Sequence, residues 1–578
     1  MESQNNHSKW FYVFLAVITM INICQARFTE LFHDEAYYWM WSKDLALGYY
    51  DHPPFIAWII SLGNSLINNE LGVRFVTVFL HTMVLYLLYL LTDKEKPLLF
   101  ITLLLCIPFI HIGGFFAVPD SPFIFFVALY FYFYKRFLAS ESILNSFLLA
   151  LSVVGMLYSK YHGLMVIFFT LLSYPKLLTN KKFWGIVGMC LLMYLPFFYW
   201  SYEHQFDTLK YHLGGKTRRG YQLSFTVDYL VGEILATGGI IGGFLLMNLY
   251  KVKSQNTFES GLKWAGIGIF IFLFLLSFQQ RVEVNWTAAA FIPLILLGYK
   301  SLRESPQYTP LFYKIAIPTI AIMLIARIFL MYNFVFGYAK NIRCEYHYWK
   351  NWAAEIQQVA QNEAVIFCNN YQFAAKYLFY ANYKQDTLTQ LSTSLNSLHY
   401  RHNQYDIANY EEKMQGKDVL LLNSYKFREN LPSFSTQNNE TYYYLKVHNF
   451  HSFNKVKLTF ELPKTEFKPN ESVKIPITLV NAYPYPCHFS ACEELPTTIG
   501  LTFWQKGVHK WEYSQTFAEA LANTVLNDTL HRIITVKMPA QAGNYEMSFS
   551  LNLAEIQTGF NAFILTISMG CKKTMKKR

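Results

Sequence analysis

Acidic and aromatic side chains are concentrated in one short stretch near the beginning of the chain, residues 33–55, which directly follows an apolar segment. Its acids are Asp34, Glu35 and Asp51, and its rings are Tyr37, Tyr38, Trp39, Trp41, Tyr49 and Tyr50. A carboxylate can accept a proton as a general base, and an aromatic ring can pack against the apolar face of a sugar. At the edge of a bilayer, this combination indicates chemistry between a lipid-borne group and an acceptor outside the cytoplasm.

Asp34 and Glu35 are neighbours in the sequence. On a helix, neighbouring side chains point about 100° apart, so the two carboxylates cannot form a tight dyad with each other. We expect one to face a reacting group, where partial desolvation by Trp39 and Trp41 suits it to act as a base, and the other to bind a metal or an internal partner. A solvated interfacial loop whose rings form an aromatic belt is the alternative.

Two further sites in the sequence place polar side chains next to apolar segments, where their presence needs an explanation. The sequence Asp51-His52-Pro53-Pro54 is a rigid turn that either aims Asp51 and His52 into a site or forms the elbow before an interfacial helix, and the elbow is favoured. Lys160 lies between two apolar segments, where a cation costs about 2.5–3.5 kcal/mol at the centre of a membrane helix unless it is paired or near water. Lys160 is therefore a functional candidate, with snorkelling to the interface as the competing account.

The composition is that of a membrane protein. The 578 residues are 53% hydrophobic and only 15% charged, whereas a soluble domain has about a quarter charged residues. The formal net charge of +11 agrees with the excess of Lys and Arg in cytoplasmic loops and is not accompanied by any nucleic-acid-binding motif. Among the cysteines, Cys487 and Cys492 are close enough in sequence to pair in an oxidising compartment.

Apolar runs predict about eleven membrane spans between residues 10 and 335. We expect them near 10–26, 75–92, 98–117, 121–138, 143–158, 162–175, 183–200, 229–249, 264–278, 286–299 and 313–335. Alternate loops are rich in Lys and Arg and should be cytoplasmic, which places the N-terminus inside and everything after residue 335 outside. The first span, which has no small-residue cleavage site behind it, is interpreted as a retained anchor.

The external loops predicted in this way carry further candidate residues. They include Asp120, in Pro119-Asp120-Ser121-Pro122, and the later residues Lys216, Arg218, Arg219, Arg281, Glu283, Asn285 and Trp286. Lys and Arg are expected mainly in cytoplasmic loops, so cations on the outer side need an explanation. Binding of an anionic partner such as a lipid phosphate would explain them. Contact with lipid headgroups is the simpler alternative.

The predicted fold is a polytopic α-helical membrane protein followed by two soluble domains outside the cytoplasm. Residues 1–338 form the membrane core. Residues 339–452 mix a helical stretch with short apolar runs, which is typical of an α/β unit. Residues 453–571 alternate apolar and polar side chains in about seven short strands, which predicts an immunoglobulin-like β-sandwich. Residues 572–578 are a basic tail.

Five motifs, in this order along a polytopic chain, resemble one family. They are DEAYYW, GYYDHPP, VPDSP, SKYHG and VEVNW. This combination is similar to the GT-C membrane glycosyltransferases that use polyprenyl-phosphate-linked sugars, a superfamily that includes protein O-mannosyltransferases and the lipid A aminoarabinose transferase. The resemblance covers roughly residues 10–450 and is strongest in the first 300.

The resemblance implies an inverting transfer of sugar from a polyprenyl phosphate to lipid A, another glycan or a protein, at the outer face of a membrane, most simply a bacterial inner membrane. It assigns the catalytic base to Asp34, an assisting or metal-contacting role to Glu35, and the second acidic position to Asp120. Lys160, Arg218 and Arg281 are the candidates for contacting the donor phosphate. The remaining substrate-binding candidates are Tyr49, Tyr50, Asp51, His52, Asn285 and Trp286. A divalent cation, held by Asp34 and Glu35, is an open possibility, and no other cofactor is implied.

Two functions of other classes compete with this hypothesis. A transporter or flippase of a lipid-linked substrate would explain charges inside the membrane, and it predicts repeated halves and broken helices. A membrane-anchored binding protein would use the sandwich alone, but it leaves the acids and rings of residues 33–55 unexplained.

Overall fold

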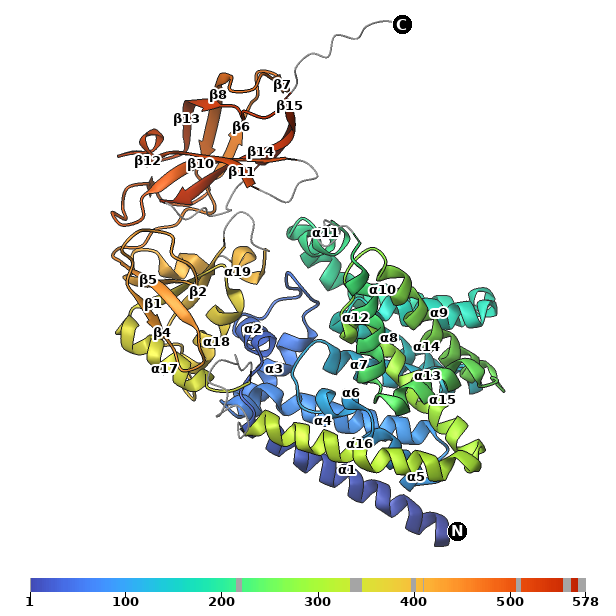
Figure 1. Ribbon diagram of the computed structural model, residues 1–578. Coiled ribbons are helices and arrows are strands. Elements are labelled where there is room, and N and C mark those ends of the chain that lie inside the picture. The colour runs from blue at the N-terminus through green and yellow to red at the C-terminus, as the bar shows by residue number, and fades with distance from the viewer. Residues whose placement is uncertain are drawn as a thin grey trace, which may run out of the picture. The chain divides into compact units, whose positions relative to one another are not determined.

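The computed structural model describes residues 2–214, 221–332, 346–396, 402–408, 410–505, 511–554 and 563–569. It divides into two compact units (Figure 1). The first comprises Met1–His347 with Tyr383–Asp386, and the second comprises Tyr348–Asn382 with Thr387–Arg578. Arg218 lies outside the described residues.

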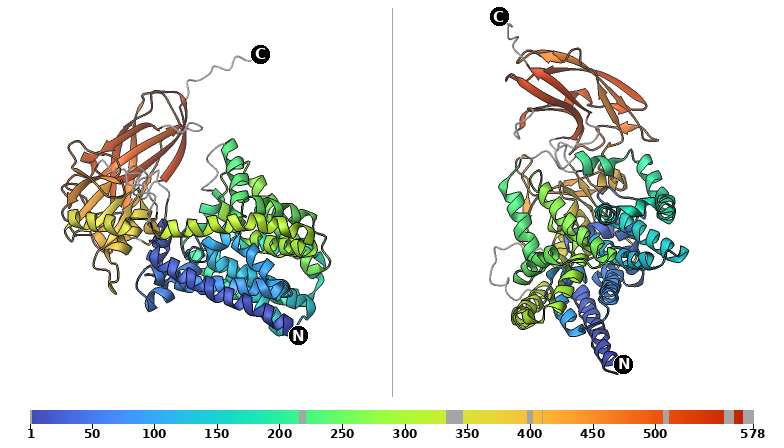
Figure 2. Two further views of the ribbon diagram at one scale, coloured as in Figure 1. Left: turned by 60° about the horizontal axis from the view of Figure 1, so that its bottom comes forward. Right: turned by 90° about the vertical axis from the view of Figure 1, so that its right-hand side faces the viewer.

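The first unit is helical. Its first half contains α1 (Glu2–Phe28), α2 (His33–Trp41), α3 (Phe55–Leu66), α4 (Glu70–Leu91), α5 (Pro97–Leu105), α6 (Pro108–Gly113), α7 (Asp120–Ala139), α8 (Ile143–Ser159) and α9 (Gly163–Ser173). Its second half contains η1 (Pro175–Thr179), α10 (Lys181–Glu203), α11 (Asp207–Gly214), α12 (Leu223–Ala236), α13 (Ile240–Lys251), α14 (Thr257–Leu276), η2 (Val284–Ala290), α15 (Phe291–Glu304), η3 (Pro306–Tyr308) and α16 (Thr309–Met331). The two helices at the ends of this series, α1 and α16, lie side by side (Figures 1 and 2).

Six helices in the described residues are long and apolar enough to cross a membrane, or seven if the bent pair α12–α13 is one span. This is fewer than the eleven spans expected, because several apolar runs form short or broken helices. The run at 98–117 is divided into α5 and α6, each of which begins with a proline. The run at 229–249 bends by 99° between α12 and α13, where Gly238 and Gly239 adopt positive φ angles of 106° and 64°, a conformation that glycine adopts without steric cost.

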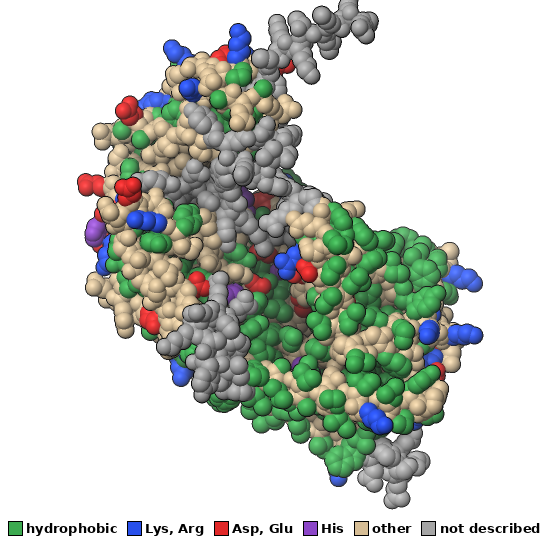
Figure 3. Space-filling view, viewed as in Figure 1, with side chains coloured by type: hydrophobic (Ala, Val, Ile, Leu, Met, Phe, Trp, Pro, Cys, Tyr) green, Lys and Arg blue, Asp and Glu red, His purple; other side chains and the backbone are tan. Residues whose placement is uncertain are grey.

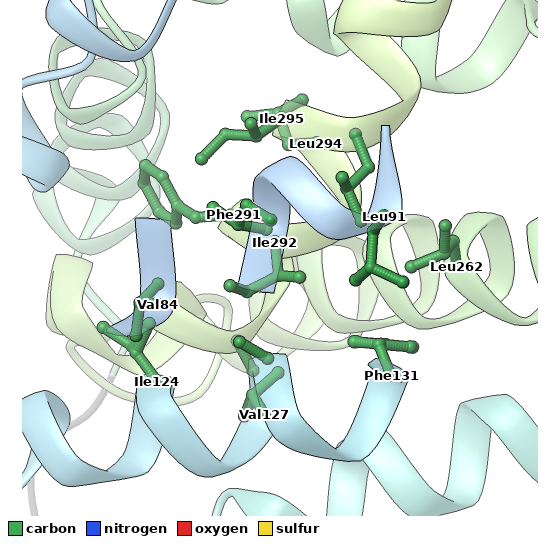
Figure 4. Packing of buried hydrophobic residues seen from close by; sticks show 14 of the residues in the cluster. Val84, Leu91, Ile124, Val127, Phe131, Leu262, Phe291, Ile292, Leu294 and Ile295 are labelled. Carbon is green, nitrogen blue, oxygen red and sulfur yellow. The ribbon is translucent and has the colours of Figure 1, made fainter. Parts of the chain in front are cut away.

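A continuous apolar core holds these helices together. Figure 4 shows how α4, α7, α14 and α15 contribute to it through Val84, Leu91, Ile124, Val127, Phe131, Leu262, Phe291, Ile292, Leu294 and Ile295. Much of the outer surface of the first unit is also apolar, with Lys and Arg side chains at its margin (Figure 3). An apolar belt bordered by cations is the surface expected of a protein surrounded by lipid, and the first unit is therefore a multi-pass membrane domain.

The second unit begins with an α/β fold, as predicted. Helices α17 (Trp349–Ala360), α18 (Tyr371–Ala381) and α19 (Gln404–Ile407) and the 3-10 helix η5 (Tyr410–Met414) accompany a five-stranded sheet of order β2-β1-β3-β5-β4. Its strands are β1 (Ala364–Cys368), β2 (Ser392–Leu395), β3 (Val419–Asn423), β4 (Ser433–Ser435) and β5 (Thr441–Val447). β1 pairs parallel with β2 and β3, whereas β5 pairs antiparallel with β3 and β4.

The rest of the second unit is a β-sandwich, which confirms that prediction. One sheet has the order β11-β10-β14-β15-β7 and the other β13-β8-β6, with a small β12-β9 pair beside them. The strands are β6 (Lys457–Phe460), β7 (Glu466–Phe467), β8 (Ser472–Val480), β9 (Cys487–His488), β10 (Thr497–Gln505), β11 (Trp511–Phe517), β12 (Val525–Leu526), β13 (Thr529–Lys537), β14 (Gly543–Leu553) and β15 (Phe563–Met569), with η6 (Ala518–Ala520) after β11.

The two cysteines considered for pairing do not form a disulfide. Cys487 and Cys492 are both buried free thiols. The Cys487 thiol donates to Asn481 Oδ1 over 3.3 Å, and the Cys492 thiol lies 3.8 Å from Glu494 Oε2. Each sulfur therefore has a polar partner of its own, and burial raises the pKa of both thiols, that of Cys487 to about 11.

Candidate functional site

Glu35 and Arg74 form an ion pair at the base of α2, and both side chains are fully buried. Arg74 Nε donates to Glu35 Oε1 over 2.7 Å, and Arg74 Nη2 donates to Oε2 over 2.5 Å. The remaining Arg74 N–H groups bind the carbonyl oxygens of Ala26, Thr29 and Glu30, which lie at and just after the end of α1. Arginine has five N–H donors in a rigid fork, and all of its nitrogens have acceptors here.

The Glu35 carboxylate is equally well satisfied. Besides Arg74, it accepts the backbone N–H of Phe32 over 2.9 Å and that of Ala117 over 2.8 Å. Both oxygens are thus occupied by protein donors, which leaves no position for a metal ion or a reacting group. Of Asp34 and Glu35, one was expected to bind a metal or an internal partner, and Glu35 has an internal partner in Arg74. We therefore assign Glu35 a positioning role in place of catalytic assistance or metal binding.

Asp34 differs from its neighbour because it is half-buried. It lies in the first turn of α2, where the partial positive charge of a helix N-terminus stabilises a carboxylate. Since the bonds of Glu35 fix the rotation of α2, and neighbouring side chains point about 100° apart, Asp34 is directed away from the Arg74 pair. The described residues contain no group of three or more His, Cys, Asp or Glu side chains arranged to hold a metal ion.

A second cluster joins Asp120, Lys160 and Asn285, which come from three distant parts of the chain. Lys160 Nζ donates to Asp120 Oδ1 over 2.6 Å and lies 3.2 Å from the carbonyl oxygen of Asn285. The Asn285 side-chain amide donates to Asp120 Oδ2 over 2.9 Å. Lys160 follows the last residue of α8, and Asp120 is the first residue of α7, so the break between two short helices positions the cation opposite a helix N-terminus.

Two contacts extend this cluster. The ring of Trp286 lies 5.4 Å from that of His162, two residues after Lys160. Ala117, whose N–H binds Glu35, lies three residues before Asp120 in the same loop. The loops that carry the DEAYYW, VPDSP, SKYHG and VEVNW motifs are therefore linked by direct contacts.

The GYYDHPP turn is an elbow, because α3 begins at Phe55 directly after Pro54. It also buries Asp51, which accepts a hydrogen bond from the Tyr37 hydroxyl over 2.8 Å, while His212 Nε2 lies 2.9 Å from the Asp51 carbonyl oxygen. The His52 ring lies 6.4 Å from that of His212, so this turn brings two histidines and an acid together.

Two of the predicted substrate-binding residues, Tyr49 and Arg281, have other partners in this structure. Tyr49 is almost completely buried, its ring stacks on Trp41 at 4.5 Å, and its hydroxyl donates to backbone carbonyls. Burial raises its pKa to about 12, and its ring and hydroxyl contacts hold the turn against the end of α2. Arg281 is mostly exposed in an ion pair with Glu283 at 3.2 Å and makes no contact with the Asp120 cluster in the described residues. Tyr50 is half-buried in the same turn as Asp51.

Sequence reasoning missed the partners of these acids. Arg74 directly precedes the span predicted at 75–92. A cation beside an apolar run needs an anionic or hydrogen-bonding partner, and this argument, which was applied to Lys160, should also have been applied to Arg74. Glu233 in α12 is a further buried acid, and both of its oxygens lie 2.9 Å from the Thr287 hydroxyl. In the sequence, Glu233 could have been recognised as a candidate because it is an acid inside an apolar segment.

Residues 51–200 match the family model described as dolichyl-phosphate-mannose-protein mannosyltransferase. The chain is 24% identical over 296 residues to the lipid A galacturonosyltransferase RgtD of Rhizobium johnstonii, an alignment that covers 47% of this chain and 60% of that protein. It is 32% identical over 282 residues to an uncharacterised protein of Aquifex aeolicus, covering 45% of this chain and 56% of the other. The chain thus spans somewhat more than half the length of these relatives.

Two solved structures share the fold. ArnT from Cupriavidus metallidurans in the apo state superposes with a TM-score of 0.55 and 12% identity, covering 75% of this chain and 98% of that one. The same protein bound to undecaprenyl phosphate gives a TM-score of 0.53 and 11% identity, covering 76% and 98%. At these identities the likeness concerns the fold.

Proposed function

We propose that this chain, a GT-C superfamily protein, is a membrane glycosyltransferase that moves a sugar from a polyprenyl phosphate to an acceptor at the non-cytoplasmic surface. One observation carries the proposal. The Asp120–Lys160–Asn285 cluster is tied through Ala117 to Glu35, the residue that orients α2 and Asp34. Acids and a cation from several loops are thereby gathered at one place, as the transfer of a sugar from a phosphate requires.

In the proposed reaction Asp34 is the general base. It takes the proton from an acceptor hydroxyl, whose oxygen attacks the anomeric carbon of the donor sugar. The bond between that carbon and the phosphate oxygen breaks, the electron pair leaves with the polyprenyl phosphate, and the configuration of the carbon is inverted. A positioned base typically contributes about 10²–10⁴-fold to such a rate.

Lys160 is the proposed contact to the donor phosphate. An ammonium group has three N–H donors, and in the described residues two of them have acceptors, Asp120 and the Asn285 carbonyl. The third donor can bind a phosphate oxygen while Asp120 keeps the ammonium in place. A charge-assisted bond of this kind stabilises the negative charge that develops on the leaving group.

Lipid A is the acceptor to test first, because the relative RgtD is a lipid A glycosyltransferase by name. The chain would then act in a bacterial inner membrane, with the α/β unit and the sandwich outside the cytoplasm. The broken pair α12–α13 is a feature that the transporter hypothesis also predicts. Chemistry on the donor distinguishes the two, because a transporter moves the lipid-linked sugar without releasing polyprenyl phosphate.

The test uses the full chain in proteoliposomes that contain lipid A and undecaprenyl phosphate carrying mannose, galacturonate or aminoarabinose. Mass spectrometry measures modified lipid A and free undecaprenyl phosphate. Asp34→Asn should reduce transfer by at least 100-fold, whereas Asp44→Asn, a change at an exposed acid just after α2, should leave it unchanged. Undiminished transfer by a folded Asp34→Asn protein would remove Asp34 from the mechanism. Movement of the donor across the bilayer without release of undecaprenyl phosphate would favour the transporter.

A further inference from the structure

The three-stranded sheet of the β-sandwich has one buried face and one exposed face. Along β8, residues 473, 475, 477 and 479 are buried in the sandwich core, and the residues between them point outward. β6 alternates in the same way, as does the second half of β13. Because side chains alternate across a strand, these three strands present one continuous outer face, here called the outer face of β6, β8 and β13 (Figure 1).

This outer face is basic and rich in hydroxyl groups. Its outward residues are Lys457, Thr459, Ser472, Lys474, Pro476, Thr478, Thr529, His531, Ile533, Thr535 and Lys537. The three strands contain no Asp or Glu. One exposed acid, Glu461, directly follows β6 and is hydrogen-bonded through its backbone N–H to Pro476, so the face carries three lysines against one acid. Figure 3 shows Lys and Arg side chains over the part of the sandwich where Figure 1 labels β8 and β13. An excess of one charge on one face is an electrostatic signal for a partner of opposite charge.

The strand register spaces the cations along the sheet. Thr535 lies opposite Lys474, and Lys537 lies opposite Ser472, at one end of the face. Lys457 lies opposite Val480 at the other end. Lys474 and the residue opposite Lys457 are six positions apart on β8, which is about 20 Å at about 3.3 Å per residue. This separation suits an extended polymer better than a small anion.

Hydroxyl groups occupy the middle of the face. Thr478 lies between Thr459 and His531 on the neighbouring strands, and its hydroxyl is 3.0 Å from His531 Nδ1. Pro476 and Ile533 lie opposite each other and are both exposed. Hydroxyls beside a small apolar platform match a sugar ring, which has hydroxyl edges and a C–H face.

The lysines of this face differ from two other lysines of the second unit. Lys464 is paired with Glu471 at 2.5 Å, and Lys455 is paired with Glu412. By contrast, the three lysines of the outer face have no ion pair in the part of the chain that the structure describes. Lysines on edge strands commonly prevent sheets from pairing with each other, but this does not explain Lys474, because β8 is the central strand of its sheet.

We propose that the outer face of β6, β8 and β13 binds an anionic glycan, a polysaccharide with carboxylate or phosphate groups, that lies along the strands. The lysines at the two ends bind its anionic groups, and the threonines and His531 bind sugar hydroxyls between them. A glycan is favoured over a lipid bilayer because the exposed Pro476 and Ile533 lie in the middle of the face, between lysines and hydroxyl groups, where they cannot be inserted into a membrane. This binding is independent of the proposed transfer chemistry.

The experiment measures binding of polygalacturonate, with neutral dextran as a reference, to the immobilised full chain in detergent without any donor lipid. The triple variant Lys457→Gln, Lys474→Gln, Lys537→Gln should weaken binding at least tenfold. The control variant Lys455→Gln, Lys464→Gln, Lys468→Gln makes the same change in net charge elsewhere in the second unit and should weaken it less than twofold. Thermal unfolding of both variants should stay close to that of the parent protein, because five of the six side chains are exposed, Lys455 is half-buried, and surface ion pairs such as those of Lys455 and Lys464 contribute only about 0–1 kcal/mol.

Binding to polygalacturonate should also decrease as salt is added, since exposed charges are screened. Equal effects of the two triple variants would overturn the proposal, as would dextran binding as tightly as polygalacturonate. Phosphatidylglycerol vesicles or a single-stranded oligonucleotide that bind at least as tightly through the same three lysines would replace the glycan with a membrane surface or a nucleic acid. Because donor lipid is absent, none of these results depends on the activity of the membrane domain.

Discussion

The membrane domain contains two buried ion pairs at the same group of loops, Glu35–Arg74 and Asp120–Lys160, and they differ in how completely their polar groups are satisfied. Every oxygen and nitrogen of the Glu35–Arg74 pair has a protein partner, and both side chains are inaccessible. Lys160 has one N–H donor without an acceptor in the described residues, and 9% of the Asp120 side chain is exposed. The Glu35–Arg74 pair, here called the complete pair, therefore has no polar group left for a ligand. The Asp120–Lys160 pair, here called the incomplete pair, retains one N–H group that can bind a ligand.

This difference shows how two acids that look alike in the sequence acquire different roles. A buried charge is tolerated only when it is paired and hydrogen-bonded, and the complete pair uses those bonds to join α1, α2 and the loop before α7. Glu35 therefore fixes the position of α2, and its neighbour Asp34, which is not part of this pair, can take the role proposed for it above. In the second pair, Asp120 holds Lys160 without using all of its donors.

The largest effect is expected when the complete pair is broken. Arg74→Gln leaves the Glu35 charge buried without its cation, which typically destabilises a protein by about 3–5 kcal/mol. We expect most of the protein to be lost from the membrane, and the remainder to unfold at a clearly lower temperature in detergent. Arg74→Lys keeps the charge but not the fork, so it should be intermediate. A melting temperature for Arg74→Gln equal to that of the parent protein would mean that the pair does not hold these segments together.

Some of this arrangement could be predicted from the sequence. Lys160 was identified because a cation beside apolar segments needs a partner, and Asp120 and Asn285 were identified from the predicted external loops and the family resemblance. The five motifs implied a fold that two solved structures share. The α/β unit and the sandwich followed from helical stretches and from alternation with period two. Such local patterns can be predicted from the sequence, because the spacing of apolar residues depends on which face of a helix or strand is buried.

Other features could not be predicted, because they depend on contacts between distant residues. No spacing rule connects Asp120 with Lys160, which are 40 positions apart, or Glu35 with Arg74, which are 39 apart. Tyr49 was a substrate-binding candidate through the resemblance carried by the GYYDHPP motif, whereas its burial depends on contact with Trp41. The bend at Gly238 and Gly239 interrupts an apolar run that reads as one straight span.

The second prediction uses the incomplete pair. Lys160→Met should reduce sugar transfer by about 100-fold, because removing a single preorganised donor to a developing negative charge costs about 2.7–4 kcal/mol. The double variant Asp120→Asn, Lys160→Met carries no charge, so it should recover much of the stability lost by Lys160→Met without recovering transfer. Thermal unfolding and the transfer assay measure the two quantities separately. If the double variant regains activity, Lys160 serves only to neutralise Asp120, and the donor phosphate is bound elsewhere.

The smallest effect is expected at Arg281, whose pair with Glu283 is exposed on both sides. Exposed ion pairs contribute about 0–1 kcal/mol, because water and salt screen both charges. Arg281→Ala should therefore change transfer by less than twofold and leave the melting temperature unaltered. Measuring the KM for donor lipid separately from kcat makes this test sensitive to a role in binding. A tenfold rise in that KM with unchanged stability would show that Arg281 contacts the donor phosphate, and the exposure of an ion pair would then be a poor guide to the residues that bind substrate.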